Sequence, residues 1–180
     1  MKAVLDACVL YPTVLREILL GVAARGLFEP LWSDRILGEW VRATAKLGDA
    51  AQVIATGEAA LLRAKFPRGF VRENIDIERR LLLPDPDDVH VLAVAIAGHA
   101  DCIVTVNAVD FPRHALAAEG IDRRDPDGLL WLLWSHHPTL VEDVVRAVHA
   151  TAEAMSGDVI PLKSMMKRAQ LPKLAKAMGV

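Results

Sequence analysis

Four acidic residues stand at positions where carboxylates could gather to bind a metal ion. They are Asp6, Glu39, Asp88 and Asp110. Asp6 and Asp110 each follow an apolar segment, whereas Asp88 lies in a turn rich in Pro and Asp. Carboxylate oxygens are the ligands that Mg²⁺ and Mn²⁺ prefer. Carboxylates that converged without a cation would repel one another, so a shared location predicts a divalent-metal site.

Such a site has a definite chemistry. A bound divalent ion can acidify a water molecule, orient a phosphate group and neutralise charge on a leaving oxygen. Hydrolysis of a phosphodiester needs these functions and needs no protein nucleophile. The residue types by themselves therefore predict metal-dependent phosphotransfer or hydrolysis, without specifying the substrate.

The apolar pattern shows how these residues could meet. Lys2–Leu5 and Cys102–Val106 have the composition of short buried strands, directly before Asp6 and shortly before Asp110. Loops at the carboxyl ends of parallel strands converge on one crevice. Asp88 would approach from the start of a helix over about Asp87–Ala97, where Pro86 and neighbouring acids suit the first turn.

Further helices are expected between and after these segments, and 27–32 is expected to connect them rather than to form a strand. The expected helices cover Thr13–Ala24, a segment capped by Ser33, Asp49 to about Phe66, a segment before Gly120, and one opened by Asp125. Helices that alternate with short apolar strands predict an α/β sandwich with a parallel sheet.

A boundary is expected at Ser135-His136-His137-Pro138. It would separate a domain of residues 1–135 from a helical extension of residues 136–180. The extension ends in a basic tail, 161–180, that contains no acid. Two interpretations of this tail stay open: its lysines could contact RNA phosphates, or they could form the solvated side of helices whose Leu and Met residues pack inward, which we favour.

Composition narrows the class of protein. The 180 residues are 53% hydrophobic and 24% charged, with a net charge of −2, which are values of a globular chain rather than of one that coats nucleic acid by bulk charge. No apolar run approaches the ~20 residues of a membrane span, and Asp6 interrupts any signal-like segment. A cytoplasmic protein with two free thiols, Cys8 and Cys102, is expected.

Four motifs together resemble those of PIN-domain proteins, in the order found in that family and over roughly residues 1–130. The first is Leu5-Asp6-Ala7-Cys8-Val9-Leu10 and the second is Trp32-Ser33-Asp34-Arg35-Ile36-Leu37-Gly38-Glu39. The third is Pro84-Asp85-Pro86-Asp87-Asp88 with His90-Val91-Leu92-Ala93, and the fourth runs from Ile103 to Pro112. Within the family, the pattern is most similar to that of VapC-like toxins.

The resemblance implies a fold, a cofactor and an activity. The fold is a Rossmann-like, three-layer α/β/α sandwich with a C-terminal helical extension. The activity is endoribonuclease cleavage with Mg²⁺ or Mn²⁺, by a toxin that a cognate antitoxin protein restrains, and a homodimer is a further implication. The site implied by position has four catalytic acids and two supporting polar residues: Asp6, Glu39, Asp88 and Asp110, of which Asp6, Asp88 and Asp110 bind metal, with Thr105 and Asn107 in support.

The sequence departs from the family pattern in three places. Cys8 stands where an Asn usually orients the first acid, and Asn107 replaces an acid found in many relatives. Asp85 and Asp87 crowd the third motif, so either could substitute for Asp88. Two other functions therefore stay open: a housekeeping PIN nuclease in RNA processing, and a non-catalytic PIN-like protein that binds RNA or a partner.

Simpler roles compete for some of these residues. Glu39 could belong to a solvated helix face, and His90 is expected at the surface of its helix. The Trp residues are expected to anchor the core or an interface rather than to stack on bases. His136 and His137 are adjacent and would point apart on a helix, so they do not predict a metal site.

Overall fold

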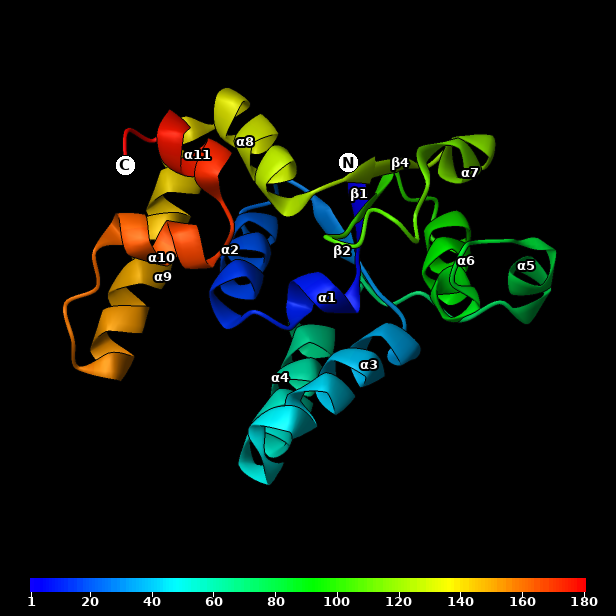
Figure 1. The fold of residues 1–180 in the computed structure, drawn as a ribbon, viewed down its shortest axis with the longest axis horizontal. Coiled ribbons are helices and arrows are strands. Elements are labelled where there is room, and N and C mark those ends of the chain that lie inside the picture. Colours follow the sequence, from blue (N-terminus) through cyan, green and yellow to red (C-terminus); the bar gives the residue numbers. More distant parts are fainter. The chain divides into compact units, whose positions relative to one another are not determined.

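The computed structural model describes all 180 residues of the chain (Figure 1). They form two compact units. The first unit comprises Met1–Tyr11 and Phe28–Arg124, and the second comprises Pro12–Leu27 and Asp125–Val180. No helix in either unit has the length and apolar character that crossing a bilayer requires.

The first unit is built on a four-stranded sheet in the order β2-β1-β3-β4, in which all neighbours are parallel. Its strands are β1 (Lys2–Leu5), β2 (Glu29–Leu31), β3 (Cys102–Val104) and β4 (Asp122–Arg124). The expectation that residues 27–32 only connect other elements is wrong, because Glu29–Leu31 pairs with β1. Pro30 obscured this strand in the sequence, yet β2 is an edge strand, where proline is tolerated.

Helices flank this sheet and bring the candidate residues to it. They are α1 (Ala7–Leu10), α3 (Asp34–Thr44), α4 (Asp49–Lys65), α5 (Ile75–Arg80), α6 (Val89–Ala97) and α7 (Arg113–Ala118), with 3-10 turns η1 (Ala45–Leu47) and η2 (Pro86–Asp88). The Ser33 hydroxyl caps α3 as predicted, accepting from Ile36 N at 3.3 Å. All residues of α6 except His90 are apolar, and residues 90–95 are buried because this helix packs against β1 and β3. The predicted α/β fold with a short parallel sheet and additional C-terminal helices is confirmed.

The second unit is entirely helical. It contains α2 (Thr13–Ala24), α8 (Pro126–His136), α9 (Pro138–Ser156), α10 (Leu162–Arg168) and α11 (Pro172–Ala177). α9 packs against α2 and α8, and α11 packs against α8. A Cβ atom on Gly21 would lie only 2.6 Å from Val144 Cγ1, so the contact between α2 and α9 requires glycine there.

The C-terminal tail packs into this helical unit. Its apolar residues Met165, Met166, Leu171 and Leu174 are buried, while its lysines are exposed. This is the packed arrangement that we favoured from the sequence. Helix α2 and helix α8, which begins at Pro126, belong to the same compact unit as α9–α11. The division of the chain into a domain of residues 1–135 and an extension of residues 136–180 stays a prediction.

Candidate functional site

The order of the strands places a topological switch point between β1 and β3 in the first unit. From β1 the chain continues to β2 on one side, and from β3 it continues to β4 on the other side. Ligands of open α/β sheets bind at such a switch point, beyond the carboxyl ends of the strands. Leu5 is paired with Val104, so the next residues of both strands, Asp6 and Thr105, meet there. Asp6 N donates to Val104 O at 3.2 Å, and the Thr105 hydroxyl donates to Asp6 Oδ2 at 2.7 Å.

Cys8 provides a second hydrogen bond to the same carboxylate. Its Sγ donates to Asp6 Oδ2 at 3.0 Å and also lies 3.3 Å from Thr105 Oγ1. Burial raises the pKa of the Cys8 thiol to about 12, and the adjacent charge of Asp6 acts in the same direction. The thiol is therefore protonated at neutral pH and can donate. It orients Asp6, which is the role that the resemblance assigned to Asn.

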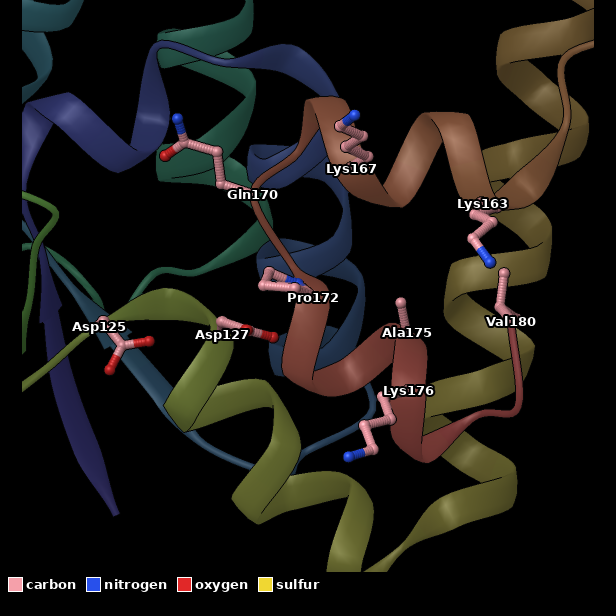
Figure 2. Close-up of a pocket in the computed structure, with 9 residues that line it drawn as sticks. All are labelled: Asp125, Asp127, Lys163, Lys167, Gln170, Pro172, Ala175, Lys176 and Val180. Atoms are coloured by element: carbon pink, nitrogen blue, oxygen red, sulfur yellow. The ribbon is translucent and has the colours of Figure 1, made fainter.

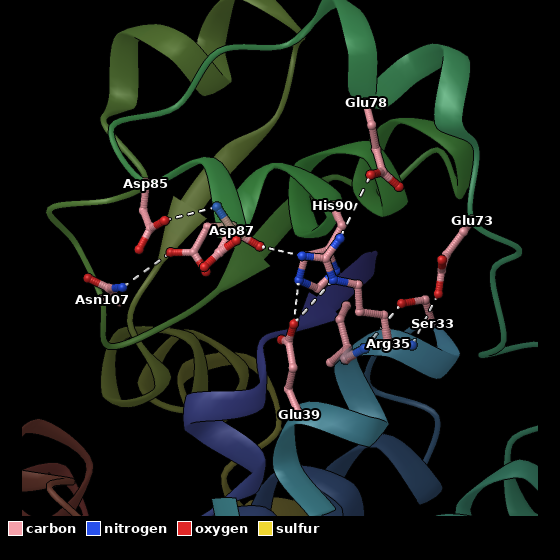
Figure 3. Close-up of polar contacts among 11 residues, drawn as sticks. Ser33, Arg35, Glu39, Glu73, Glu78, Asp85, Asp87, His90 and Asn107 are labelled. Atoms are coloured by element: carbon pink, nitrogen blue, oxygen red, sulfur yellow. Dashed lines mark hydrogen bonds and ion pairs between the residues drawn. The ribbon is translucent and has the colours of Figure 1, made fainter. Parts of the chain in front are cut away.

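Three further carboxylates gather beside the strand ends. Asp85, Asp88 and Asp110 each offer an oxygen, and these oxygens all lie within 4.8 Å of one another. Asp85 also caps η2, since its Oδ1 accepts from Asp87 N at 2.9 Å. Asn107 lies next to this group (Figure 3), and its Nδ2 donates to Asp110 Oδ2 at 2.5 Å and to Asp88 Oδ2 at 3.4 Å. Three hard oxygen ligands at this spacing fit a divalent cation.

The electrostatics of Asp88 reflect this concentration of negative charge. Burial, together with the charges of Asp6, Asp85 and Asp110, raises the pKa of Asp88 to about 6. Asp6 lies close enough for its charge to raise the pKa of Asp88, although its oxygens lie outside the group of three carboxylates. A cation bound among these residues would remove the repulsion that favours protonation.

Glu39 lies on α3 and is directed toward Arg35 and His90 rather than toward the group of three carboxylates (Figure 3). His90 Nε2 is 3.0 Å from Glu39 Oε1, an ion-pair distance, although neither ring nitrogen of His90 makes an aligned hydrogen bond. Arg35 Nε donates to the same oxygen at 3.4 Å. Burial would raise the pKa of Glu39, but the contacts and charges of His90 and Arg35 outweigh it, so the pKa is lowered.

Arg35 and His90 connect α3 to the segment that carries Asp88. Arg35 NH2 donates to the carbonyl of Asp87 at 3.2 Å, and His90 lies in the first turn of α6. The expectation of a surface histidine is wrong, because α6 is buried on almost all sides and the His90 side chain has no exposed area. Glu39 therefore joins α3 to this segment through Arg35 and His90.

The structure places the predicted residues unequally. Asp88 and Asp110 share the carboxylate group, Asp6 lies next to it, and Thr105 and Asn107 hold these acids in position. Glu39 is outside the group. The residue that the predicted metal ligands omitted is Asp85, and the crowding of Asp in Pro84–Asp88 was its signal. The roles of Arg35 and His90 left no such signal, because they depend on the packing of α3 against η2 and α6.

The fold and the site together define an α/β protein with a carboxylate centre at the switch point of a parallel sheet. Comparison with protein-family models matches the PIN domain over residues 2–108. The chain belongs to the PIN-domain family. PIN domains are generally metal-dependent nucleases, and the matched range contains Asp6, Glu39 and Asp88 but ends before Asp110. No curated protein and no solved structure matches the chain.

A separate pocket lies within the helical second unit (Figure 2). It has a volume of about 730 Å³, and three lysines line it: Lys163 and Lys167 from α10 and Lys176 from α11. None of the three forms an ion pair. Asp127, on the same wall, accepts from the backbone N–H groups of Lys173 and Leu174. We refer to Lys163, Lys167 and Lys176 as the pocket lysines.

Proposed function

We propose that this protein is a divalent-metal-dependent endoribonuclease that hydrolyses RNA phosphodiester bonds. One observation carries the proposal: the oxygens of Asp85, Asp88 and Asp110 lie within 4.8 Å of one another beside the buried Asp6, in a chain of the PIN-domain family. Such a group is unfavourable without a cation and favourable with one.

Each residue has a distinct role in this proposal. Asp88 and Asp110 bind Mg²⁺ or Mn²⁺, with Asp85 as an additional ligand and Asp6 on the adjacent wall. The metal supplies an acidic water and neutralises charge on the phosphate. Asn107 holds the Asp110 carboxylate, and Thr105 and Cys8 hold that of Asp6. Glu39 acts through His90 and Arg35 by fixing α3 to the segment that carries Asp88.

We also propose that the protein acts in the cytoplasm as the toxin of a type II toxin–antitoxin pair. The support is the similarity of its four acidic motifs to VapC-like toxins. A cognate antitoxin would restrain the activity by covering the carboxylate centre. Without that cover, the centre would cleave cellular RNA. A housekeeping RNA nuclease would use the same chemistry without such a partner.

The pocket lysines provide a second place for RNA to bind. Phosphate contacts by lysine are independent of sequence and lose strength with salt, because binding releases counterions. The chain as a whole carries a net charge of −2, so RNA binding depends on local clusters of positive charge. The pocket lysines form one such cluster, since none of them is in an ion pair, although Asp125 and Asp127 line the same pocket.

Cleavage assays with matched variants test the proposed activity. The purified protein is incubated with a panel of structured and single-stranded RNAs in Mg²⁺, in Mn²⁺ and in EDTA. We expect metal-dependent cleavage by the wild type, none with Asp6→Asn or Asp110→Asn, and unchanged cleavage with Asp158→Asn. Asp158 is exposed, and its carboxylate forms no hydrogen bond or ion pair in the chain, so this control removes one acid that belongs to the other unit.

The outcome also separates the alternatives. If the folded protein binds RNA but cleaves none with either metal, the result would support the non-catalytic hypothesis and contradict the proposed nuclease activity. Overexpression in bacterial cells distinguishes the two nuclease roles, because a toxin arrests growth and Asp6→Asn relieves the arrest. Cleavage in vitro without any effect on growth would favour a housekeeping nuclease.

A further inference from the structure

The loop between β3 and α7 carries Asp110 and is attached to the rest of the first unit in two halves. The first half is held by side chains of the site. Asn107 N donates to Thr105 Oγ1 at 2.9 Å, and Val106 N donates to the sulfur of Cys8 at 3.4 Å. Both contacts precede Asp110, so other residues must hold the second half of the loop.

The backbone of the second half has one polar attachment, the guanidinium of Arg123. Its Nη1 donates to the carbonyl of Ala108 at 2.5 Å and to the carbonyl of Phe111 at 2.8 Å. No backbone N–H group of residues 109–111 donates to another backbone group. The two carbonyls lie on either side of Asp110 along the chain, so Arg123 fixes the backbone both before and after this residue.

Arg123 neutralises no carboxylate of the chain. It lies on the edge strand β4, paired in register with Ile103. The neighbouring acid, Asp122, forms its ion pairs with Arg113 at 3.1 Å and with Arg124 at 3.3 Å. Arg123 itself forms no ion pair. Its charge instead strengthens its two bonds to the loop, because charged donors form stronger hydrogen bonds than neutral ones.

The position of Asp110 needs such support because its carboxylate meets two others. An oxygen of Asp110 lies within 4.8 Å of oxygens of Asp85 and Asp88, and carboxylates at this spacing repel one another without a cation. Repulsion would move a loosely held loop away from the group. Asn107 donates to Asp110 but belongs to the same loop and would move with it. Arg123 belongs to the sheet, so its bonds resist this movement.

We propose that Arg123 is a positioning residue of the carboxylate centre, which holds Asp110 in place for metal binding through the carbonyls of Ala108 and Phe111. This role rests on the proposed function, because it requires that the centre binds a divalent ion. Arg123 lies outside residues 2–108, the range that matches the PIN domain. Residues that orient a metal ligand without touching the metal typically contribute about 10–100-fold to metal affinity.

Calorimetric titration with Mn²⁺ measures the contribution of this contact. Arg123→Met keeps an apolar stem but removes both hydrogen bonds, so the dissociation constant should rise at least about tenfold. Arg123→Lys restores a charged donor without the planar guanidinium, so the rise should be smaller, about threefold. Arg113→Met is the matched control: it removes the same charge three positions after Asp110, from a side chain that is 65% exposed and pairs with Asp122, and the affinity should stay within about twofold.

A double-mutant cycle with Asp110→Asn separates positioning of Asp110 from a general loss of structure. Asp110→Asn by itself should weaken Mn²⁺ binding at least about tenfold, because it removes a ligand. If Arg123 acts through Asp110, then adding Arg123→Met to Asp110→Asn should weaken binding by less than about twofold more. General damage to the site would instead reduce the affinity by the same factor in both backgrounds. Circular dichroism verifies that each variant folds.

Nuclear magnetic resonance tests the attachment of the loop without any metal. In EDTA, the backbone order parameters of residues 108–111 should be near about 0.85 in the wild type, the value of rigid backbone. Arg123→Met should lower them below about 0.6, whereas the values for β1 and β3 should not change. Arg113→Met should leave the loop as rigid as in the wild type. This measurement does not depend on nuclease activity.

Three outcomes would overturn the proposal. One is Mn²⁺ binding that Asp110→Asn weakens but Arg123→Met does not, which would remove the role of Arg123 and leave the nuclease function standing. Another is a loss in Arg123→Lys as large as in Arg123→Met, or an additive loss in the double variant. The third is a loop that stays rigid in Arg123→Met. If the wild type binds no Mn²⁺, the proposed function itself is contradicted, and the positioning role with it.

Discussion

Neutralising Asp88 should stabilise the metal-free protein while removing its function. Burial and the charges of Asp6, Asp85 and Asp110 raise the pKa of Asp88 from 3.8 to about 6. At pH 7 the ionised carboxylate of Asp88 is therefore less stable in the folded chain than in the unfolded chain. Asp88→Asn removes that charge and keeps the size of the side chain.

The size of the effect follows from the shift. Unscreened, it corresponds to about 3 kcal/mol, and for a partly solvated carboxylate we expect about 1 kcal/mol after screening. In a chain of this length that is an increase in Tm of about 2–4 °C. A raised carboxylate pKa means that the folded state binds more protons between about pH 4 and pH 6, so stability falls as pH rises through this range. The gain in stability of the Asp88→Asn variant over the wild type should be complete above pH 6 and absent below pH 4.

Thermal unfolding of both proteins in EDTA and in Mg²⁺ provides the assay. In EDTA at pH 7 the variant should be the more stable protein. At Mg²⁺ concentrations about 100-fold above the dissociation constant, the wild type should gain about 2.7 kcal/mol and the variant much less, so the order reverses. The control, Asp158→Asn, should have little effect under either condition.

Two results would refute the reasoning. If Asp88→Asn lowers Tm in EDTA at pH 7, repulsion from the neighbouring carboxylates does not destabilise the ionised Asp88. If Asp158→Asn stabilises the protein as much as Asp88→Asn does, the effect is one of net charge rather than of the carboxylate group.

Three other changes test the surroundings of the site. Cys8→Val removes the thiol donor to Asp6 and should lower metal affinity or cleavage at least about tenfold. Cys8→Ser keeps a donor and should retain most of both. Equal loss in the two variants would mean that Cys8 acts by packing rather than by hydrogen bonding. Glu39→Gln should leave the Mn²⁺ affinity, measured by calorimetry, within about threefold of the wild type. It should destabilise the protein by about 1 kcal/mol, because His90 and Arg35 lose their anionic partner. Loss of metal binding without loss of stability would instead show that Glu39 is a metal ligand. Alanine at all three pocket lysines should reduce the salt dependence of single-stranded RNA binding by a slope of about 2, measured by fluorescence anisotropy on an Asp6→Asn background, and an unchanged slope would exclude phosphate contact by these lysines.

The sequence alone determined the elements whose local signals are strong. Thr13–Ala24 and Asp49–Lys65 form helices close to the predicted bounds, and Ser33 caps α3, although Asp49 does not cap α4 as predicted. The short parallel sheet also followed from the alternation of apolar strands and helices. These features depend on residues close together in the chain, so a local pattern is sufficient to reveal them.

Weak local signals hid other elements. Pro30 concealed β2, and β4 is formed by the charged residues Asp122–Arg124, which have no strand pattern of their own. Both are edge strands, and their pairing with β1 and β3 provides what their composition lacks. Strand pairing connects residues distant in the chain, so it is a property of the tertiary structure.

The candidate site divides in the same way. The sequence identified Asp6, Asp88 and Asp110 because their neighbours carry family-like motifs and place them at strand ends or a helix start. Only the tertiary structure added Asp85 to the group and directed Glu39 toward His90 and Arg35. The physical reason is that a carboxylate takes whichever cation or donor the packing brings within about 3 Å, and that choice is made by contacts between α3, η2 and α6 rather than by spacing along the chain.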